Sequence, residues 1–109
     1  MRQKTVVRRR RANDDIESAI AYYFDEAGPS VAFDFVDRFE EVVKKISREP
    51  AAGSQRFGEA LQIQGLRQWP MNRFPYLIFY VEKEKHVEIV RVLHTSVDIS
   101  TWLKPDDAE

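Results

Sequence analysis

Histidines and arginines are the side chains of this sequence that could take part in acid–base or phosphate chemistry. His86 and His94 lie eight residues apart in one segment rich in β-branched residues. In an extended strand that spacing corresponds to about 26 Å, so the two imidazoles cannot share a metal ion. We expect His86, beside a short polar turn, to be solvated. His94 ends the segment, and two roles stay open for it: a structural pair with Asp98, or a direct part in catalysis or partner contact.

Two arginines fall within predicted strands. We expect Arg67, at the start of an edge strand, to be exposed and functional, whereas Arg91 interrupts an otherwise apolar strand. A charge in a central strand must be paired or face a cleft, because burying it alone is costly. For Arg91 a structural carboxylate partner and a functional contact both stay open. Trp69, Arg73 and Phe74 add a mixture of aromatic and cationic side chains that suits a protein interface or single-stranded nucleic acid.

Other signatures of catalysis are missing from the sequence. It contains no cysteine, which excludes disulfides and thiol chemistry and predicts a reducing, cytoplasmic location. It has no glycine-rich phosphate loop and no Ser/His/Asp signature. Asp34, Asp37 and Glu41 share one helical face, for which we expect exposed ion pairs rather than a metal site. We therefore expect no metal, no cofactor and no small-molecule substrate.

Length and composition predict one domain over residues 1–109. The chain is 43% hydrophobic and 12% aromatic, as is typical of globular proteins, and its net charge of −1 does not indicate nucleic-acid binding. Basic side chains gather before residue 12, whereas Asp106, Asp107 and Glu109 make the other end acidic. The run of arginines at 8–11 is either a solvated strand end or an anion-facing patch. No apolar run reaches the ~18 residues of a membrane helix, and the basic start lacks the apolar stretch of a signal peptide.

The elements that position these side chains follow from periodicity and from breaker residues. Gly28 ends one predicted helix and Pro29 starts the next, so the two helices form a tight hairpin. Residues 50–64 are expected to be irregular, with a possible short strand at 59–64. The predicted strands are 4–8, 66–69, 76–81 and 87–94, and the predicted helices are 11–26 and 29–48.

The order β-α-α-β-β-β predicts an α+β domain in which a helical hairpin packs on one face of an antiparallel sheet. We expect the second strand to run antiparallel to the first. The central strands are apolar on both faces, so both faces need a cover, and we expect a partner to supply the second one. Tyr22, Phe24 and Phe33 fall beside or off the main apolar stripes. A partner segment that is disordered when free is expected to fold across them.

Motifs distributed along nearly the whole chain support a family resemblance. They are Ala12, Asp15-Ile16, Ile20, Tyr23, Gly28, Ala32, Phe35, Ile46, Pro50, Gly53, Gly65-Leu66-Arg67, Pro75-Tyr76-x-Ile78-x-Tyr80, Val90-Arg91-Val92-Leu93-His94 and Asp98. In this order and spacing the chain resembles the ParE toxins, a branch of the RelE/ParE superfamily of bacterial type II toxin–antitoxin modules. The predicted β-α-α-β-β-β order is also the fold of that family.

The resemblance implies a toxin of the bacterial cytoplasm that is neutralised by a ParD-like antitoxin. It implies that the toxin inhibits DNA gyrase by binding, stalls the enzyme on cleaved DNA, and meets DNA only indirectly. The RelE branch instead cuts mRNA on the ribosome. At two positions where that branch carries a basic residue, this chain has Leu77 and Val97, and neither side chain can stabilise an oxyanion. A RelE-like ribonuclease is therefore the alternative, with His94, Arg67 and Arg91 as its candidate catalytic residues.

The gyrase interpretation assigns two contact surfaces. Tyr22, Phe24 and Phe33 are the candidate antitoxin-binding residues. The candidate residues for contact with the target or partner are Arg67, Trp69, Arg73, Phe74, Arg91 and His94.

Overall fold

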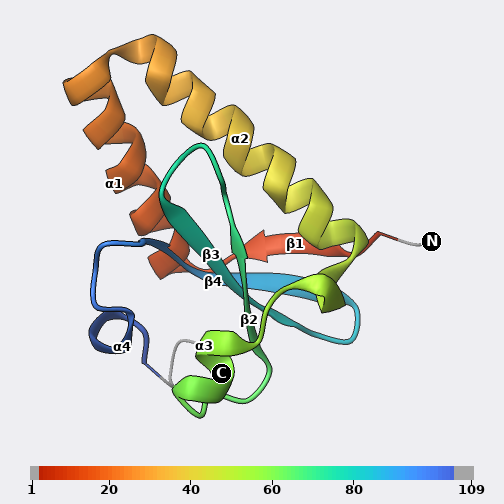
Figure 1. The fold of residues 1–109 in the computed structure, drawn as a ribbon. Helices are drawn as coiled ribbons and strands as arrows, with labels where there is room; N and C mark the ends of the chain where they lie inside the picture. Colours follow the sequence, from red (N-terminus) through yellow and green to blue (C-terminus); the bar gives the residue numbers. More distant parts are fainter. Residues whose placement is uncertain (1–2, 105–109) are drawn as a thin grey trace.

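The protein, seen here as a computed structural model that describes residues 3–104, has its long helices and its strands in the predicted order (Figure 1). Asp106, Asp107 and Glu109 of the predicted acidic end lie outside the described residues. The elements are β1 Thr5–Arg8, α1 Arg10–Ala27, α2 Pro29–Arg48, the 3-10 turn Pro50–Ala52, α3 Arg56–Ala60, β2 Leu66–Pro70, β3 Tyr76–Glu82, β4 His86–His94 and α4 Ile99–Trp102.

Helices α1 and α2 form the predicted tight hairpin. Gly28, at φ 91°, is the single residue between them, and its amide donates to the Phe24 carbonyl over 3.1 Å. This left-handed conformation is one that glycine adopts readily, and Pro29 needs no amide partner in the first turn of α2. Apolar residues at a helical period give α2 its buried side. They are Ala32, Phe35, Phe39, Val42 and Ile46.

The sheet is mixed, so the prediction of an antiparallel sheet is wrong in one pairing. Its strand order is β1-β4-β3-β2, with β1 parallel to β4 and the other two pairs antiparallel. The prediction that the second strand runs antiparallel to the first is also wrong, because β2 runs in the same direction as β1. The Lys4 amide donates to the Ser47 carbonyl over 3.1 Å, which places the end of α2 beside the start of β1. The chain therefore enters β2 from the end of the sheet at which β1 began.

The chain itself covers much of the second sheet face, where a partner was expected. A second apolar cluster joins the sheet to α3, α4 and the loops beside them, below the sheet in Figure 1. Its buried members are Ile63, Leu66, Phe79, Val81, Val90, Leu93, Ile99 and Leu103.

Residues 50–64 are not the irregular or extended stretch that was predicted, because they contain a 3-10 turn and α3. Phe57 and Leu61 pack from this stretch against the second cluster. Gly58 permits the approach: a Cβ there would lie 2.5 Å from the Leu66 carbonyl oxygen. Glycine and proline interrupt the periodicity of this stretch, which is why its short helix left no clear signal in the sequence.

Candidate functional site

A buried ion pair lies at the base of the candidate site. Arg91, 3% exposed on β4, donates from Nε and Nη2 to the two carboxylate oxygens of Asp15 over 2.8 and 2.9 Å. Its Nη1 donates to the Trp102 carbonyl over 2.6 Å. The Val92 amide lies beyond the end of β1, where no strand can pair with it, and Asp15 accepts it as well, over 2.9 Å. Of the two expectations for Arg91, the structure shows the pair with a carboxylate.

Two adjoining hollows share Tyr76, and Asp15 of this pair lines the larger one. The larger, about 610 Å³, is bounded by α1, the end of β4 and α4, and its lining includes Tyr22, His94 and Trp102. The smaller, about 390 Å³, lies along the β2–β3 turn, and its lining includes Arg73 and Phe74. We call the two together the Tyr76 groove. It brings four of the sequence-predicted contact residues to one region: Tyr22, Arg73, Phe74 and His94.

Packed aromatic rings hold Tyr76 in place. The Tyr76 ring lies 5.4 Å from Phe35 of α2, and Phe35 lies 5.4 Å from Phe74, so the helical hairpin and the β2–β3 turn share one aromatic cluster. Edge-to-face pairs of this kind add stability beyond the area that they bury. Burial, reinforced by the neighbouring Tyr23, raises the pKa of Tyr76 to about 12. The phenol therefore stays neutral near pH 7 and can only donate or accept hydrogen bonds.

His94 lies beside Tyr76 and does not pair with Asp98. The imidazole centroid is 5.1 Å from that of Tyr76, and Nδ1 accepts the Ser96 amide over 3.0 Å. Asp98 caps α4 instead and accepts from the amide and the hydroxyl of Ser100 over 3.2 and 2.7 Å. The predicted His94–Asp98 pair is therefore wrong, because donors at the start of α4 occupy the carboxylate. These hydrogen bonds, that of the Ser100 hydroxyl first, lower the pKa of Asp98.

Arg67 and Trp69 lie away from the groove. Arg67 pairs in register with Tyr80 and donates from Nη1 to the Gly53 carbonyl over 2.8 Å. At ~3.3 Å per residue, Tyr80 is about 13 Å along β3 from Tyr76. Trp69 is half-buried and packs against the core below the helices. The three residues of the ribonuclease alternative are thus not gathered, since Arg67 binds a loop carbonyl, Arg91 binds Asp15 and His94 alone lines the groove.

Sequence comparison decides the family. A family model described as "ParE toxin of type II toxin-antitoxin system, parDE" matches residues 6–99. The chain belongs to the ParE toxin family. This confirms the resemblance drawn from the motifs.

The fold of this ParE-family chain is similar to that of a solved structure titled "Chromosomal ParDE TA system from P. aeruginosa". The TM-score is 0.74 at 22% sequence identity, and the match covers 86% of this chain and 98% of the other. No curated protein matches the chain. The structural match confirms the ParE-like α+β fold.

Exposed aromatic side chains extend from the groove to the tip of the helical hairpin. Tyr22 and Phe24 of α1 are 56% and 54% exposed, and Phe33 of α2 is 68% exposed. Trp102, 50% exposed on the groove wall, was not among the predicted contact residues. The signal in the sequence was weak, because a helix as short as α4 gives little periodicity to separate its exposed Trp102 from buried Ile99.

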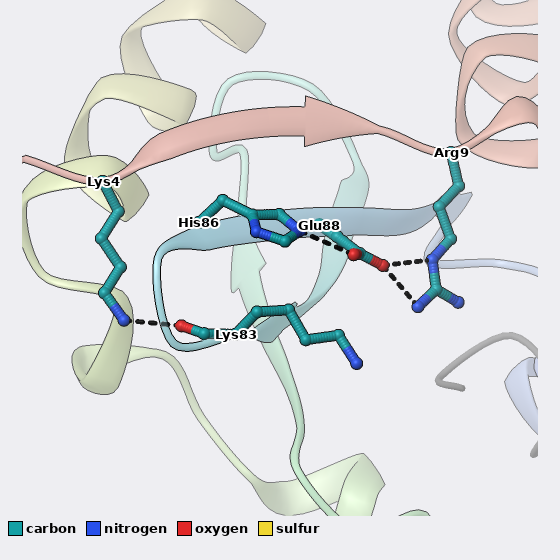
Figure 2. A network of polar contacts seen from close by, with 5 residues as sticks. All are labelled: Lys4, Arg9, Lys83, His86 and Glu88. Atoms are coloured by element: carbon teal, nitrogen blue, oxygen red, sulfur yellow. Dashed lines mark hydrogen bonds and ion pairs between the residues drawn. The ribbon is translucent and has the colours of Figure 1, made fainter.

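A polar network fixes the other end of β4 (Figure 2). His86 is not simply solvated, because its Nε2 lies 2.7 Å from Oε2 of Glu88, and Arg9 donates from Nε to Oε1 over 2.8 Å. The pKa of Glu88 is lowered, and the hydrogen bond with His86 is the largest cause. Lys4 reaches the Lys83 carbonyl over 2.7 Å. These contacts fasten β1 to β4.

Within residues 3–104 no three His, Cys, Asp or Glu side chains gather in a way that could hold a metal ion. None of the described helices combines the length and the apolar character needed to cross a bilayer.

Proposed function

We propose that this ParE-family chain is a growth-inhibiting toxin that a ParD-like antitoxin neutralises, and that it acts on DNA gyrase by binding rather than by catalysis. Gyrase would be stalled on cleaved DNA, and replication would stop. Membership of a type II toxin–antitoxin family supports the antitoxin partner. The observation that carries the binding mode is that Asp15 accepts from both Nε and Nη2 of Arg91, so this guanidinium is held away from the phosphoryl chemistry that a ribonuclease would need beside His94.

The Tyr76 groove and its rim are our candidate surface for the target. Arg73 is exposed on the β2–β3 turn, at φ 56°, and offers a cation beside the half-buried Phe74 and Tyr76. Large aromatic side chains with an arginine at the edge are the composition of energetically important interface sites. Arg67, Trp69 and Arg91 would act indirectly in this proposal, by supporting the strands that carry the groove.

The exposed aromatics of the helical hairpin are our candidate surface for the antitoxin. Tyr22, Phe24 and Phe33 stand on the two helices without being part of either buried cluster. A segment that is disordered when free could bury them by folding as an amphipathic helix or an extended strand.

The experiment is a gyrase supercoiling assay with protein freed of its antitoxin, run beside an in vitro translation reaction. The proposal expects loss of supercoiling, accumulation of cleaved DNA and undiminished translation. Blocked translation with unaffected gyrase would instead support the RelE-like ribonuclease, and His94→Ala would then abolish mRNA cleavage. No effect on either reaction would reject gyrase as the target.

A further inference from the structure

The turn between β2 and β3 rises from the sheet toward the helical hairpin and contains two consecutive residues in the left-handed conformation (Figure 1). Asn72 has φ 55° and Arg73 has φ 56°. Asparagine tolerates this region, whereas an arginine there carries a steric cost that glycine would avoid. Residues in such conformations persist where their surroundings fix them, and they cluster at functional sites. Contacts from outside the turn must therefore hold its shape.

The second half of the turn is fastened to the helices and to the end of β4. The Phe74 ring lies 5.1 Å from that of Tyr23 in α1 and 5.4 Å from that of Phe35 in α2. The Pro75 carbonyl accepts the Thr95 amide over 2.8 Å. These contacts fix the chain after the left-handed pair and leave its first half to be held by other groups.

Arg38 of α2 fastens the first half. Its Nε donates to the carbonyl of Met71, the residue directly before the left-handed pair. The Met71 amide donates to the Tyr76 carbonyl over 3.0 Å, so both main-chain groups of Met71 are bound. Nη1 of Arg38 lies 3.3 Å from Glu41, and the Arg38 side chain is 12% exposed against 55% for Glu41. Arg38 thus supports the turn from beneath and offers little surface to a partner.

Arg73 is the cation that this turn presents. It is exposed, and its side chain has no hydrogen bond or ion pair with another residue that the structure describes. It lines the smaller hollow of the Tyr76 groove together with Phe74. A turn that is fixed before the target arrives spares the complex the entropy of ordering the main chain beneath Arg73.

We propose that Arg38 is a positioning residue of the target surface: by binding the Met71 carbonyl, it holds the β2–β3 turn in the shape that directs Arg73 toward the target. The turn requires the hydrogen-bond donor at Nε and not the positive charge of Arg38. The inference rests on the proposed function, because it takes the rim of the Tyr76 groove as the target surface.

Two substitutions separate the donor from the charge. The side-chain nitrogen of glutamine lies as many bonds from Cα as Nε of arginine does, so Arg38→Gln can still donate to the Met71 carbonyl. Arg38→Met places a methyl group at that point and cannot donate. Both variants lose the charge and the contact with Glu41 alike. Arg48→Met makes the same change at an exposed arginine of α2 and is the matched control.

Amide hydrogen exchange measures the turn without any target. In Arg38→Met, exchange at Met71 should speed up about tenfold, because the turn opens more often. Arg38→Gln and Arg48→Met should keep it within about twofold of the unaltered protein. Exchange at buried Ile78 in β3 separates local opening from a general loss of stability and should not change. Unaltered exchange at Met71 in Arg38→Met would overturn the proposal.

A double-mutant cycle shows whether Arg38 acts through Arg73. Viable counts after induced expression measure growth inhibition, and Arg38→Met should raise survival by about tenfold, whereas Arg38→Gln should not. In the Arg73→Glu background, Arg38→Met should raise survival by less than about twofold, since the cation that it positions is gone. Equal effects of Arg38→Met and Arg38→Gln, or a tenfold effect in both backgrounds, would overturn the proposal.

A further variant and a second assay keep the outcomes distinct. If Arg38→Met fails to fold, Arg38→Lys replaces it, because lysine keeps the charge and carries its donor one bond further from Cα. Full activity of Arg38→Lys beside a loss in Arg38→Gln would show that charge is required and would overturn the proposal. The gyrase supercoiling assay is run on the same variants. Variants that differ as expected in viable counts, while none of the proteins inhibits gyrase, would reject gyrase as the target and support the role of Arg38.

Discussion

Arg91 and Asp15, 76 positions apart in the sequence, form a two-bonded ion pair that fastens α1 to the central strand β4. Their side chains are 4% and 15% exposed. Asp15 also accepts the Val92 amide, so one carboxylate substitutes for the strand that β4 lacks beyond the end of β1. Asp15 also lines the larger hollow of the Tyr76 groove, so the pair helps to fix one wall of that groove.

Asp15→Ala should lower the free energy of unfolding by about 3–5 kcal/mol, because removing one partner leaves a buried, uncompensated charge on Arg91. Urea denaturation followed by circular dichroism measures the change. Asp14→Ala, at the exposed neighbouring position, is the matched control and should shift the free energy by less than about 0.5 kcal/mol. Equal effects at the two positions would show that the pair contributes nothing specific.

Stability should fall at alkaline pH because of Tyr80. Burial raises its pKa to about 12, against an ordinary value of 10.0. Below about pH 10 the phenol is protonated in both states, and between about pH 10 and 12 the unfolded state releases the proton first, so unfolding becomes easier as pH rises. Urea denaturation across this range measures the loss, on the order of 2 kcal/mol for this one group.

Tyr80→Phe is the control for that pH dependence, and Tyr76 contributes in the same direction. The variant should show a shallower alkaline decline, since one of the phenols with a raised pKa is gone. It should also lose about 1 kcal/mol at neutral pH, because the Tyr80 hydroxyl donates to the Pro50 carbonyl over 2.7 Å. A decline as steep as that of the unaltered protein would exclude Tyr80 as its source.

Gly58→Ala should destabilise the protein although alanine favours helices. Intrinsic propensity alone would add about 1 kcal/mol of stability in α3. The new Cβ would, however, lie 2.5 Å from the Leu66 carbonyl oxygen and 3.1 Å from that of Ile63, both main-chain atoms that cannot rotate away. Thermal unfolding compares it with Glu59→Ala, an exposed neighbour that should be nearly neutral. A higher melting temperature for Gly58→Ala would contradict the close approach.

The two long helices and the three C-terminal strands could be predicted because their signals are local. Helical periodicity on α2 and the break at Gly28-Pro29 depend on residues close together in the chain. The parallel pairing of β1 with β4 could not be read in this way. It depends on where α2 ends relative to β1, and so on long-range packing rather than on the residues of either strand.

The candidate site was only partly predictable for the same reason. Sequence identified Arg91 as a charge that needs a partner, but the partner is Asp15, in a distant helix. The spacing in the sequence suggested Asp98 as a partner for His94. The Asp98 carboxylate instead accepts hydrogen bonds from the hydroxyl groups at the start of α4. The Tyr76 groove, formed where α1, β4 and α4 meet, has no counterpart in any single sequence motif.

Phe33→Ser should weaken antitoxin binding without weakening the fold. The side chain is 68% exposed, so its loss should change the free energy of unfolding by less than about 0.5 kcal/mol. A central aromatic contact typically contributes about 2 kcal/mol or more to an interface, which corresponds to at least a tenfold rise in Kd. Isothermal titration calorimetry with the antitoxin measures this, with Asp37→Ser on the same helix as the control. Unchanged affinity would place the antitoxin elsewhere.

Arg73 and Arg67 should respond differently to charge reversal, although both are arginines of the β2–β3 region. Arg73 is exposed on the groove rim and has no hydrogen bond to another described residue, so Arg73→Glu should reduce growth inhibition and leave the melting temperature unchanged. Arg67 donates to the Gly53 carbonyl, so Arg67→Glu should cost about 1–2 kcal/mol of stability.

Arg73→Asn separates charge from backbone strain in this comparison. Arg73 adopts a left-handed conformation, φ 56°, which asparagine tolerates better than most residues do. If the positive charge contacts the target, Arg73→Asn should inhibit growth less than the unaltered protein and more than Arg73→Glu. Induced expression in bacteria with viable counts measures the order, and melting temperatures of the purified variants exclude misfolding. Full toxicity of both Arg73 variants would remove this rim from the target surface, because a cation that contacts gyrase or its DNA cannot be reversed without loss of binding.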